Sequence, residues 1–237
     1  ENNDFDATVE DRSDEFSLIA VQGPKATEWL QHFTDADLKN IPFYEFEIGN
    51  LADADNVIIS NTGYTGSGGF ELYVQNEDAV NVWNALIEKA ESYHALPCGL
   101  GSRDTLRLEK GYCLYGNDLS DETSPIEAGL SWIVKTKVKS NFVAKDIFVH
   151  QKESGVERKL MGFKLDSRRV PRNGYKIFNE TGDQEIGFVT SGTQSPCLNI
   201  PIGMGYLQID HAQAGNKIQI QMGKKNHPAE VTVLPFV

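Results

Sequence analysis

The chain has 237 residues and a formal net charge of -12, with 34 acidic residues against 22 Lys and Arg. This acidic balance argues against nucleic acid as the main partner. No stretch approaches the roughly 20 apolar residues that a membrane span requires. The three cysteines, at positions 98, 113 and 197, lie far apart without CxxC or CxxH spacing. We therefore expect a reducing compartment and no metal site.

The first part of the chain alternates between strand and helix patterns. The apolar run FSLIAVQG at 16–23 predicts a buried strand, and PKATEWLQHF at 24–33 predicts a helix that starts with a proline. Residues 44–51 and 56–74 have the pattern of strands around a glycine-rich turn. The segment 77–90 predicts an amphipathic helix with one apolar stripe, formed by Val80, Val82, Trp83, Leu86, Ile87 and Ala90.

From about residue 157 the pattern changes to short strands separated by turn signals such as RNG, ETGD and QAGN. Regular spacing of this kind is typical of a β-barrel or a sandwich. A helix and a linker are expected over 144–155. We therefore predict an α+β chain, in which a mixed strand–helix domain at 1–150 precedes a C-terminal β-barrel-like domain at 151–237.

A run of basic residues is the first candidate for chemistry. The stretch PCGLGSRDTLRLEKGYCLYGNDL at 97–119 places Arg103 and Arg107 one helical turn apart, with Lys110 following on the same face. Like charges at this spacing disfavour a helix unless acidic groups compensate them. The sequence therefore predicts acidic partners, of the protein or of a ligand, around this helix.

The second candidate is TGYTGSGGFEL at 62–72, which fits neither a dinucleotide fingerprint nor a phosphate-binding loop. A glycine-rich hairpin is its plainest interpretation. Its informative residue is Glu71, a carboxylate on an otherwise apolar strand. Glu71 either points to water or is buried against a partner, and Arg103 is a candidate for that partner. Such a pair would hold the carboxylate ionised and aimed at two N–H donors of a flat heterocycle.

Other side chains give weaker signals. The five histidines are scattered, and none lies in a strand-end motif, which argues against a Ser/His/Asp triad and against a zinc site. Tyr112, Tyr115 and Trp132 are expected to be core aromatics more often than ligand contacts. The basic cluster RRVPR at 168–172 is expected to be a solvated turn.

Several motifs follow one another in a fixed order, namely TGYTG with GFE, PCGLGSRDTLRLEKGYCLYGNDL, ETSPIEAGLSWIVK and FVAKD. In this series the chain resembles the aminomethyltransferases of the glycine cleavage system, the T-protein family. The blocks ERKLMGF, EIGFVTSGTQSPCLN and IGMGY resemble that family's β-rich C-terminal domain. The resemblance covers almost the whole chain from FSLIAVQGPKA onward. One departure is Ser67-Gly68, where the family usually carries an acidic pair.

The resemblance implies a tetrahydrofolate-dependent transferase without a metal. It implies that the enzyme takes the aminomethyl group from the lipoyl arm of the H-protein, releases ammonia and forms 5,10-methylenetetrahydrofolate. By similarity, Glu71 binds the pterin end of folate, Arg103 and Tyr64 lie in the same pocket, and Trp132 helps to line it. Folate and lipoylated H-protein are then the expected partners, without nucleic acid or membrane. The expected compartment is the bacterial cytoplasm, or the mitochondrial matrix if the source is eukaryotic.

The same resemblance bears on the remaining charges and on catalysis. Arg107 and Lys110 are interpreted as structural, offset by Asp104 and Glu109. The family's catalytic acidic residue would lie in a segment upstream of Glu1. We therefore assign no catalytic residue within the chain, and we expect the chain as given to be inactive.

Two alternatives stay open. One is the folate module of dimethylglycine or sarcosine oxidoreductases, which shares the RLEKGY element but favours a Trp-Gly pair where this chain has Leu114-Tyr115-Gly116. The other is a non-enzymatic folate-binding protein that assists iron–sulfur cluster assembly. Its KGCY-type motif resembles KGYCLYG at 110–116 only superficially.

Overall fold

The computed structural model describes residues 6–138 and 141–237. The chain forms two compact units, which divide between Cys98 and Gly99, and each unit is described by itself. Across the described ranges, no helix combines the length and the apolar character needed to cross a membrane. The predicted boundary between the two domains, at residue 150, is a different boundary from this division into compact units, and it stays a prediction.

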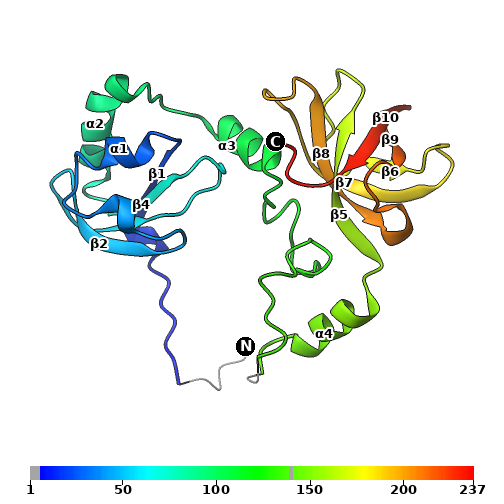
Figure 1. Cartoon of the computed structure of the whole chain (residues 1–237), viewed down its shortest axis with the longest axis horizontal. Coiled ribbons are helices and arrows are strands. Elements are labelled where there is room, and N and C mark those ends of the chain that lie inside the picture. The colour runs from blue at the N-terminus through cyan, green and yellow to red at the C-terminus, as the bar shows by residue number, and fades with distance from the viewer. Residues whose placement is uncertain (1–5, 139–140) are drawn as a thin grey trace. The chain divides into compact units, whose positions relative to one another are not determined.

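The first unit is an antiparallel sheet with strand order β1-β4-β3-β2, accompanied by helices (Figure 1). Its elements are β1 (Phe16–Gln22), α1 (Ala26–Leu30), β2 (Phe46–Leu51), β3 (Ala54–Ser60), β4 (Gly69–Gln75) and α2 (Ala79–Ala90). The predicted alternation of strands and helices is confirmed. Helix α1 is shorter than expected because Phe33 donates its N–H to the carbonyl of Leu30, which closes a turn rather than continuing the helix.

Alternation along the strands determines which face of this sheet is buried. In β4, Phe70, Leu72 and Val74 are buried against residues of both helices in one core. Helix α2 buries only Val82, Leu86 and Ala90. The apolar stripe is therefore narrower than predicted, since a single row at four-residue spacing is enough to face the sheet. The remaining apolar positions of α2 include Val80, 67% exposed, and Trp83, 44% exposed.

The opposite face of the sheet, called here the open face, also carries apolar side chains. One row across the strands, the apolar row, consists of Leu18, Tyr73, Ile58 and Ile48, which are paired in register. The next row consists of Ala20, Glu71, Ser60 and Phe46. Leu18 is 49% exposed and Ile48 is 61% exposed. The strand register therefore places Glu71 directly beside an apolar surface.

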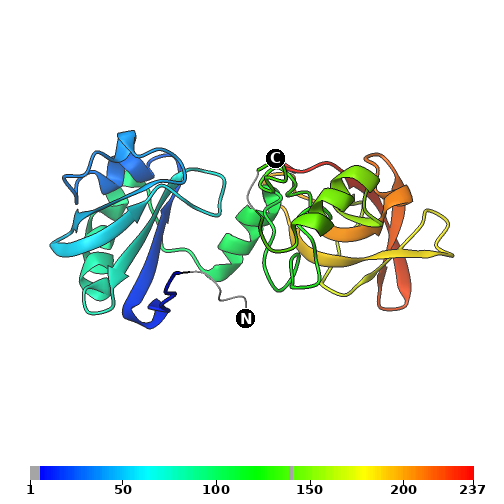
Figure 2. The ribbon, with the colours of Figure 1, turned by 90° about the horizontal axis from the view of Figure 1, so that it is seen from below.

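The second unit is built around a closed antiparallel barrel with strand order β10-β5-β8-β7-β6-β9 (Figure 2). Its elements are α3 (Leu100–Glu109), α4 (Lys145–Ser154), β5 (Arg158–Leu165), β6 (Lys176–Phe178), β7 (Glu185–Gln194), β8 (Pro201–Gln208), β9 (Lys217–Met222) and β10 (Lys225–Thr232). The predicted C-terminal barrel and the α+β class are confirmed. Helix α4 matches the helix expected over 144–155.

The IGMGY pattern reflects the position of strand β8, because both faces of this strand are covered. On the outer side, Met204 packs in one cluster with Leu108 of α3. On the inner side, Gly203 and Gly205 leave room for larger residues of other strands. A Cβ on Gly203 would lie 2.6 Å from the ring of Phe163, and one on Gly205 would lie 2.9 Å from Ile177. The glycines are therefore required by packing.

This packing predicts the effect of Gly203→Ala. The added methyl group would meet the Phe163 ring and, at 2.9 Å, the carbonyl oxygen of Ser191. We expect the free energy of unfolding to fall by roughly 1–3 kcal/mol, measured by urea denaturation. The control is Gly101→Ala in α3, where a Cβ meets nothing within 4 Å. It should not destabilise the protein, because alanine favours helices over glycine. Unchanged stability of Gly203→Ala would contradict this account of the barrel.

Candidate functional site

Glu71 lies on the open face of the first sheet, in the middle of β4. Its neighbours in sequence, Phe70 and Leu72, are buried on the other face, so the carboxylate points away from the core. Its partners in register are Ala20 on β1 and Ser60 on β3. Both are small, and Glu71 is half-buried. These small neighbours leave room for the Glu71 side chain, and the carboxylate stays partly accessible to solvent.

A chain of hydroxyl groups reaches this carboxylate from the end of β3. Thr62 Oγ1 donates to Glu71 Oε2 at 2.6 Å, and it lies 3.0 Å from Ser60 Oγ. The Thr62 N–H also donates to the carbonyl of Ser60 at 2.8 Å. One oxygen of Glu71 thus has a fixed neutral donor, and Glu71 has no ion pair among those found in the described residues.

The glycine-rich loop that follows Thr62 is held by the side chain of Gln22. Gln22 Nε2 donates to the carbonyls of Thr62 at 3.1 Å and Phe70 at 3.2 Å, so it links both ends of the loop. Its Oε1 accepts from Thr65 Oγ1 at 3.0 Å. A Cβ on Gly63 would lie 1.9 Å from that same oxygen. Glycine is required at position 63 because the Gln22 amide occupies the space of a side chain.

Sequence reasoning found Glu71 but missed Gln22 and Thr62. A signal for Thr62 was present, since a hydroxyl residue opens the glycine-rich turn two residues after a strand that pairs with β4. Gln22 gave a weaker signal, as a single amide at the end of an otherwise apolar strand. The contact of Gln22 with the loop spans 40 residues, which no local periodicity reports.

The predicted site residues belong to different parts of the fold. Tyr64 is half-buried in the same glycine-rich loop, so the structure places it in one unit with Glu71. Arg103 lies in α3 and is exposed, and Trp132 lies in the segment after α3. Both belong to the second unit. A pocket shared by Glu71 and Arg103 therefore stays a prediction.

The expectation that three aromatics of the second unit are core residues is wrong. Trp132 is 64% exposed, Tyr115 is 66% exposed and Tyr112 is 38% exposed. They lie outside the regular elements, in the stretch between α3 and α4. No helix or strand there presents them to a packed layer. Their exposure is compatible with contacts to a ligand or to another protein surface.

Arg107 is structural, as predicted, and its surroundings are more extensive than the sequence indicated. The guanidinium is 1% exposed, and it pairs with Asp118 at 2.7 Å and with Asp104 at 2.6 Å. It also donates to Ser191 Oγ at 2.9 Å and to the Tyr112 carbonyl at 3.1 Å. Burial acts to lower the pKa of Arg107, but the charge of Asp118 and the bond to Asp104 outweigh it and raise the pKa.

Asp118 is the centre of this network, and sequence reasoning missed it. Its side chain is fully buried and accepts from Arg107, from Ser191 Oγ at 2.8 Å, from Thr190 Oγ1 and from the Leu114 N–H at 2.9 Å. The network joins α3, the turn after it and strand β7. These donors supply hydrogen bonds to a carboxylate that has no access to water.

Glu109 does not offset Lys110, which corrects the sequence interpretation. Glu109 is 2% exposed, and it accepts from Ser195 Oγ at 2.5 Å and from the Cys197 N–H at 3.1 Å. Lys110 instead donates to the carbonyl of Val237 at 3.2 Å. Each of the two side chains has other partners, so their proximity along the chain did not predict an ion pair.

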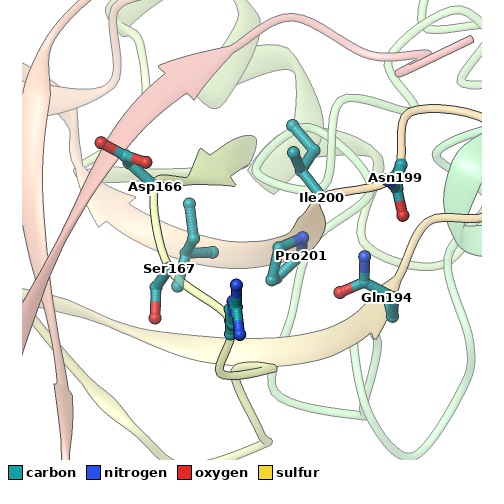
Figure 3. A pocket seen from close by; sticks show the side chains of 8 residues that line it. Asp166, Ser167, Gln194, Asn199, Ile200 and Pro201 are labelled. Carbon is teal, nitrogen blue, oxygen red and sulfur yellow. The ribbon is translucent and has the colours of Figure 1, made fainter.

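A pocket of about 410 Å³ lies on the barrel unit (Figure 3). Asp166 and Ser167, which follow β5, line one side of it, and Gln194 at the end of β7 and Asn199 just before β8 line the other. None of the four predicted site residues lines it. Most of its polar lining side chains are exposed.

Two of the three cysteines have thiols that are not activated. All three are free. Burial raises the pKa of Cys113 to about 11, and the hydrogen bond to Glu109 raises the pKa of Cys197. Both thiols therefore stay protonated near neutral pH. In the part of the chain that the structure describes, no group of three or more His, Cys, Asp or Glu could hold a metal ion.

Comparison with known families gives two matches. The family model described as the GCVT N-terminal domain matches residues 1–138. The model described as the glycine cleavage T-protein C-terminal barrel domain matches residues 158–237. The second match coincides with strands β5 to β10. The first match extends beyond the first unit and includes α3.

Similar proteins give a consistent result. The chain is 50% identical over 235 residues to an aminomethyltransferase of Bacteroides thetaiotaomicron, covering 99% of this chain and 65% of that protein. It is 47% identical over 237 residues to an aminomethyltransferase of Halothermothrix orenii, covering 100% and 65%. The chain thus spans about 65% of the length of these relatives.

A solved structure shows the same fold. The glycine cleavage system aminomethyltransferase T from Bartonella henselae matches with a TM-score of 0.71 at 24% identity. The match covers 94% of this chain and 84% of that chain. At this level of identity the likeness concerns the fold.

The two arginines of α3 allow a matched test of structural and functional roles. Arg107→Met keeps the length of the side chain but leaves Asp118 buried without its cation, so we expect a loss of roughly 3–5 kcal/mol in the free energy of unfolding. Arg103→Met, at an exposed position of the same helix, should change it by no more than about 0.5 kcal/mol. Urea denaturation measures both. Equal losses in the two variants would show that Asp118 does not depend on Arg107.

Proposed function

Because the chain belongs to the glycine cleavage T-protein family, we propose that it forms part of a tetrahydrofolate-dependent aminomethyltransferase. The enzyme takes the aminomethyl group carried on the lipoyl arm of the H-protein. The transferred carbon exchanges its bonds to sulfur and to the amine nitrogen for bonds to N5 and N10 of the folate. The hydrogens of N5 and N10 pass to these two leaving groups, so the arm is released as a thiol and the amine as ammonia. Relatives named aminomethyltransferase at 50% and 47% identity support this proposal.

The observation that carries the proposal is the setting of Glu71. A half-buried carboxylate stands on an open sheet face, with one oxygen fixed by Thr62 and an apolar row beside it. The pterin ring of folate is flat and presents an N–H and an amino group side by side. A carboxylate accepts two parallel donors of this kind. The apolar row offers a surface for such a ring, as ligand sites commonly combine apolar walls with a few polar groups.

The remaining predicted residues are assigned to the same ligand. Arg103 is an exposed cation in a protein with a net charge of -12, and it suits the anionic parts of folate because local cations attract anions in an acidic protein. Tyr64 lies in the loop that ends in β4, and Trp132 offers an exposed aromatic face. We assign all three to folate binding.

Catalysis in this proposal is mainly positioning. Folate N5 must approach a reactive carbon on the lipoyl arm, and holding both in place supplies much of the rate. We assign no catalytic residue within the chain, which spans about 65% of the length of its relatives. The H-protein is the proposed macromolecular partner, and the bacterial cytoplasm is the proposed compartment, in line with the bacterial relatives.

Folate binding by the full-length protein tests the site residues. Glu71→Gln replaces one acceptor oxygen by a donor, so tetrahydrofolate should bind at least about tenfold more weakly, since hydrogen bonds to charged groups contribute roughly 1.5–3 kcal/mol. Arg103→Ala should also weaken binding. The controls are Glu77→Gln and Arg169→Ala, both at exposed positions. Calorimetric titration gives the Kd values. Unchanged binding in both site variants would reject the proposed folate site.

An activity assay tests whether the 237 residues include the catalytic group. With aminomethylated H-protein and tetrahydrofolate, the full-length protein should release ammonia and form methylenetetrahydrofolate, whereas the 237 residues alone should not. Missing contacts and access of water both weaken the electrostatic interactions of a partial site. Full turnover by the 237 residues would place the catalytic group within them, contrary to the proposal.

A further inference from the structure

The hydroxyl chain beside Glu71 has a defined direction. Thr62 Oγ1 carries one hydrogen, and its two neighbours are a carboxylate oxygen at 2.6 Å and the Ser60 hydroxyl at 3.0 Å. A carboxylate only accepts, so the Thr62 hydrogen goes to Glu71, and Ser60 donates to Thr62 in turn. A carboxylate has about four acceptor sites. Among the hydrogen bonds found in the described residues, Thr62 occupies one of these sites, and the others remain for a ligand.

Thr62 is itself held in place by backbone contacts on both sides. Its N–H bonds the carbonyl of Ser60, and its carbonyl accepts from Gln22 Nε2 at 3.1 Å. The same amide group of Gln22 binds the carbonyl of Phe70, the residue before Glu71. The hydroxyl and the carboxylate are therefore fixed relative to each other through one side chain of the neighbouring strand.

We propose that Thr62 is a positioning residue for ligand binding, which holds the Glu71 carboxylate in the plane that accepts the two pterin N–H groups. This inference rests on the proposed function. Without the hydroxyl, a glutamate side chain on a sheet surface rotates freely about its terminal bond. A ligand that needs both oxygens in one plane must then restrict that rotation when it binds.

The test uses tetrahydrofolate titrations of the full-length protein. Thr62→Val keeps the shape of the side chain and removes the hydroxyl, and it should weaken binding about tenfold. Thr62→Ser keeps the hydroxyl and should bind within about twofold of the parent. The control is Ser17→Ala at the other end of β1, whose hydroxyl donates to Asn76 at 2.8 Å. It should bind tetrahydrofolate unchanged.

A double-mutant cycle separates positioning from a general effect on the loop. If Thr62 acts through Glu71, then Thr62→Val adds no loss to a protein that already carries Glu71→Ala. An equal loss in both backgrounds would show that Thr62 only supports the loop, which would overturn the proposal. If Thr62→Val lowers the melting temperature, the comparison of Thr62→Ala with Thr62→Ser decides, because only serine keeps the hydroxyl.

The outcomes also distinguish this inference from the proposed function. Weak binding in Glu71→Ala with normal binding in Thr62→Val would reject the positioning role and retain the folate site. Normal binding in Glu71→Ala would reject the site itself, and the inference with it.

Discussion

The pairing of Arg107 with Asp118 is the constraint around which the second unit is arranged. Neither charge is acceptable in a buried position without the other, and each has further partners that complete its hydrogen bonding. Helix α3 is thereby fixed against β7 and β8. Four residues earlier on the same helix, Arg103 is exposed. The buried arginine thus determines the direction in which the exposed one is presented.

In the first unit, a neutral side chain with several hydrogen-bond partners likewise fixes the structure around it. The Gln22 amide satisfies backbone carbonyls at both ends of the glycine-rich loop, and the loop has glycine where that amide passes. The glycines do not make this loop flexible, because Gly63 is needed for close packing against the fixed side chain of Gln22. The result is a well-defined support for Thr62 and, through it, for Glu71.

Much of the fold could be predicted from the sequence because strands and helices have local periods. Strands β5 to β9 and helix α4 appeared where turn signals and apolar spacing indicated. The partners of buried charges could not be predicted. Asp118 meets Ser191 across 73 residues, and Glu109 binds Ser195 rather than compensating Lys110, because such contacts depend on tertiary packing. At the site, the apolar pattern of its strand identified Glu71 as unusual. Its hydrogen bond with Thr62 could not be predicted without the register of β3 and β4.

The network around Asp118 has a consequence for how this family can diverge. Arg107 and Asp118 fall within the match to the N-terminal family model, whereas Thr190 and Ser191 fall within the match to the barrel model. A chimera that joins two homologues between residues 138 and 158 would draw the halves of one buried network from different parents. A crossover at Cys98–Gly99 keeps the network intact. A crossover that preserves this network therefore falls at a point that the two family matches do not mark.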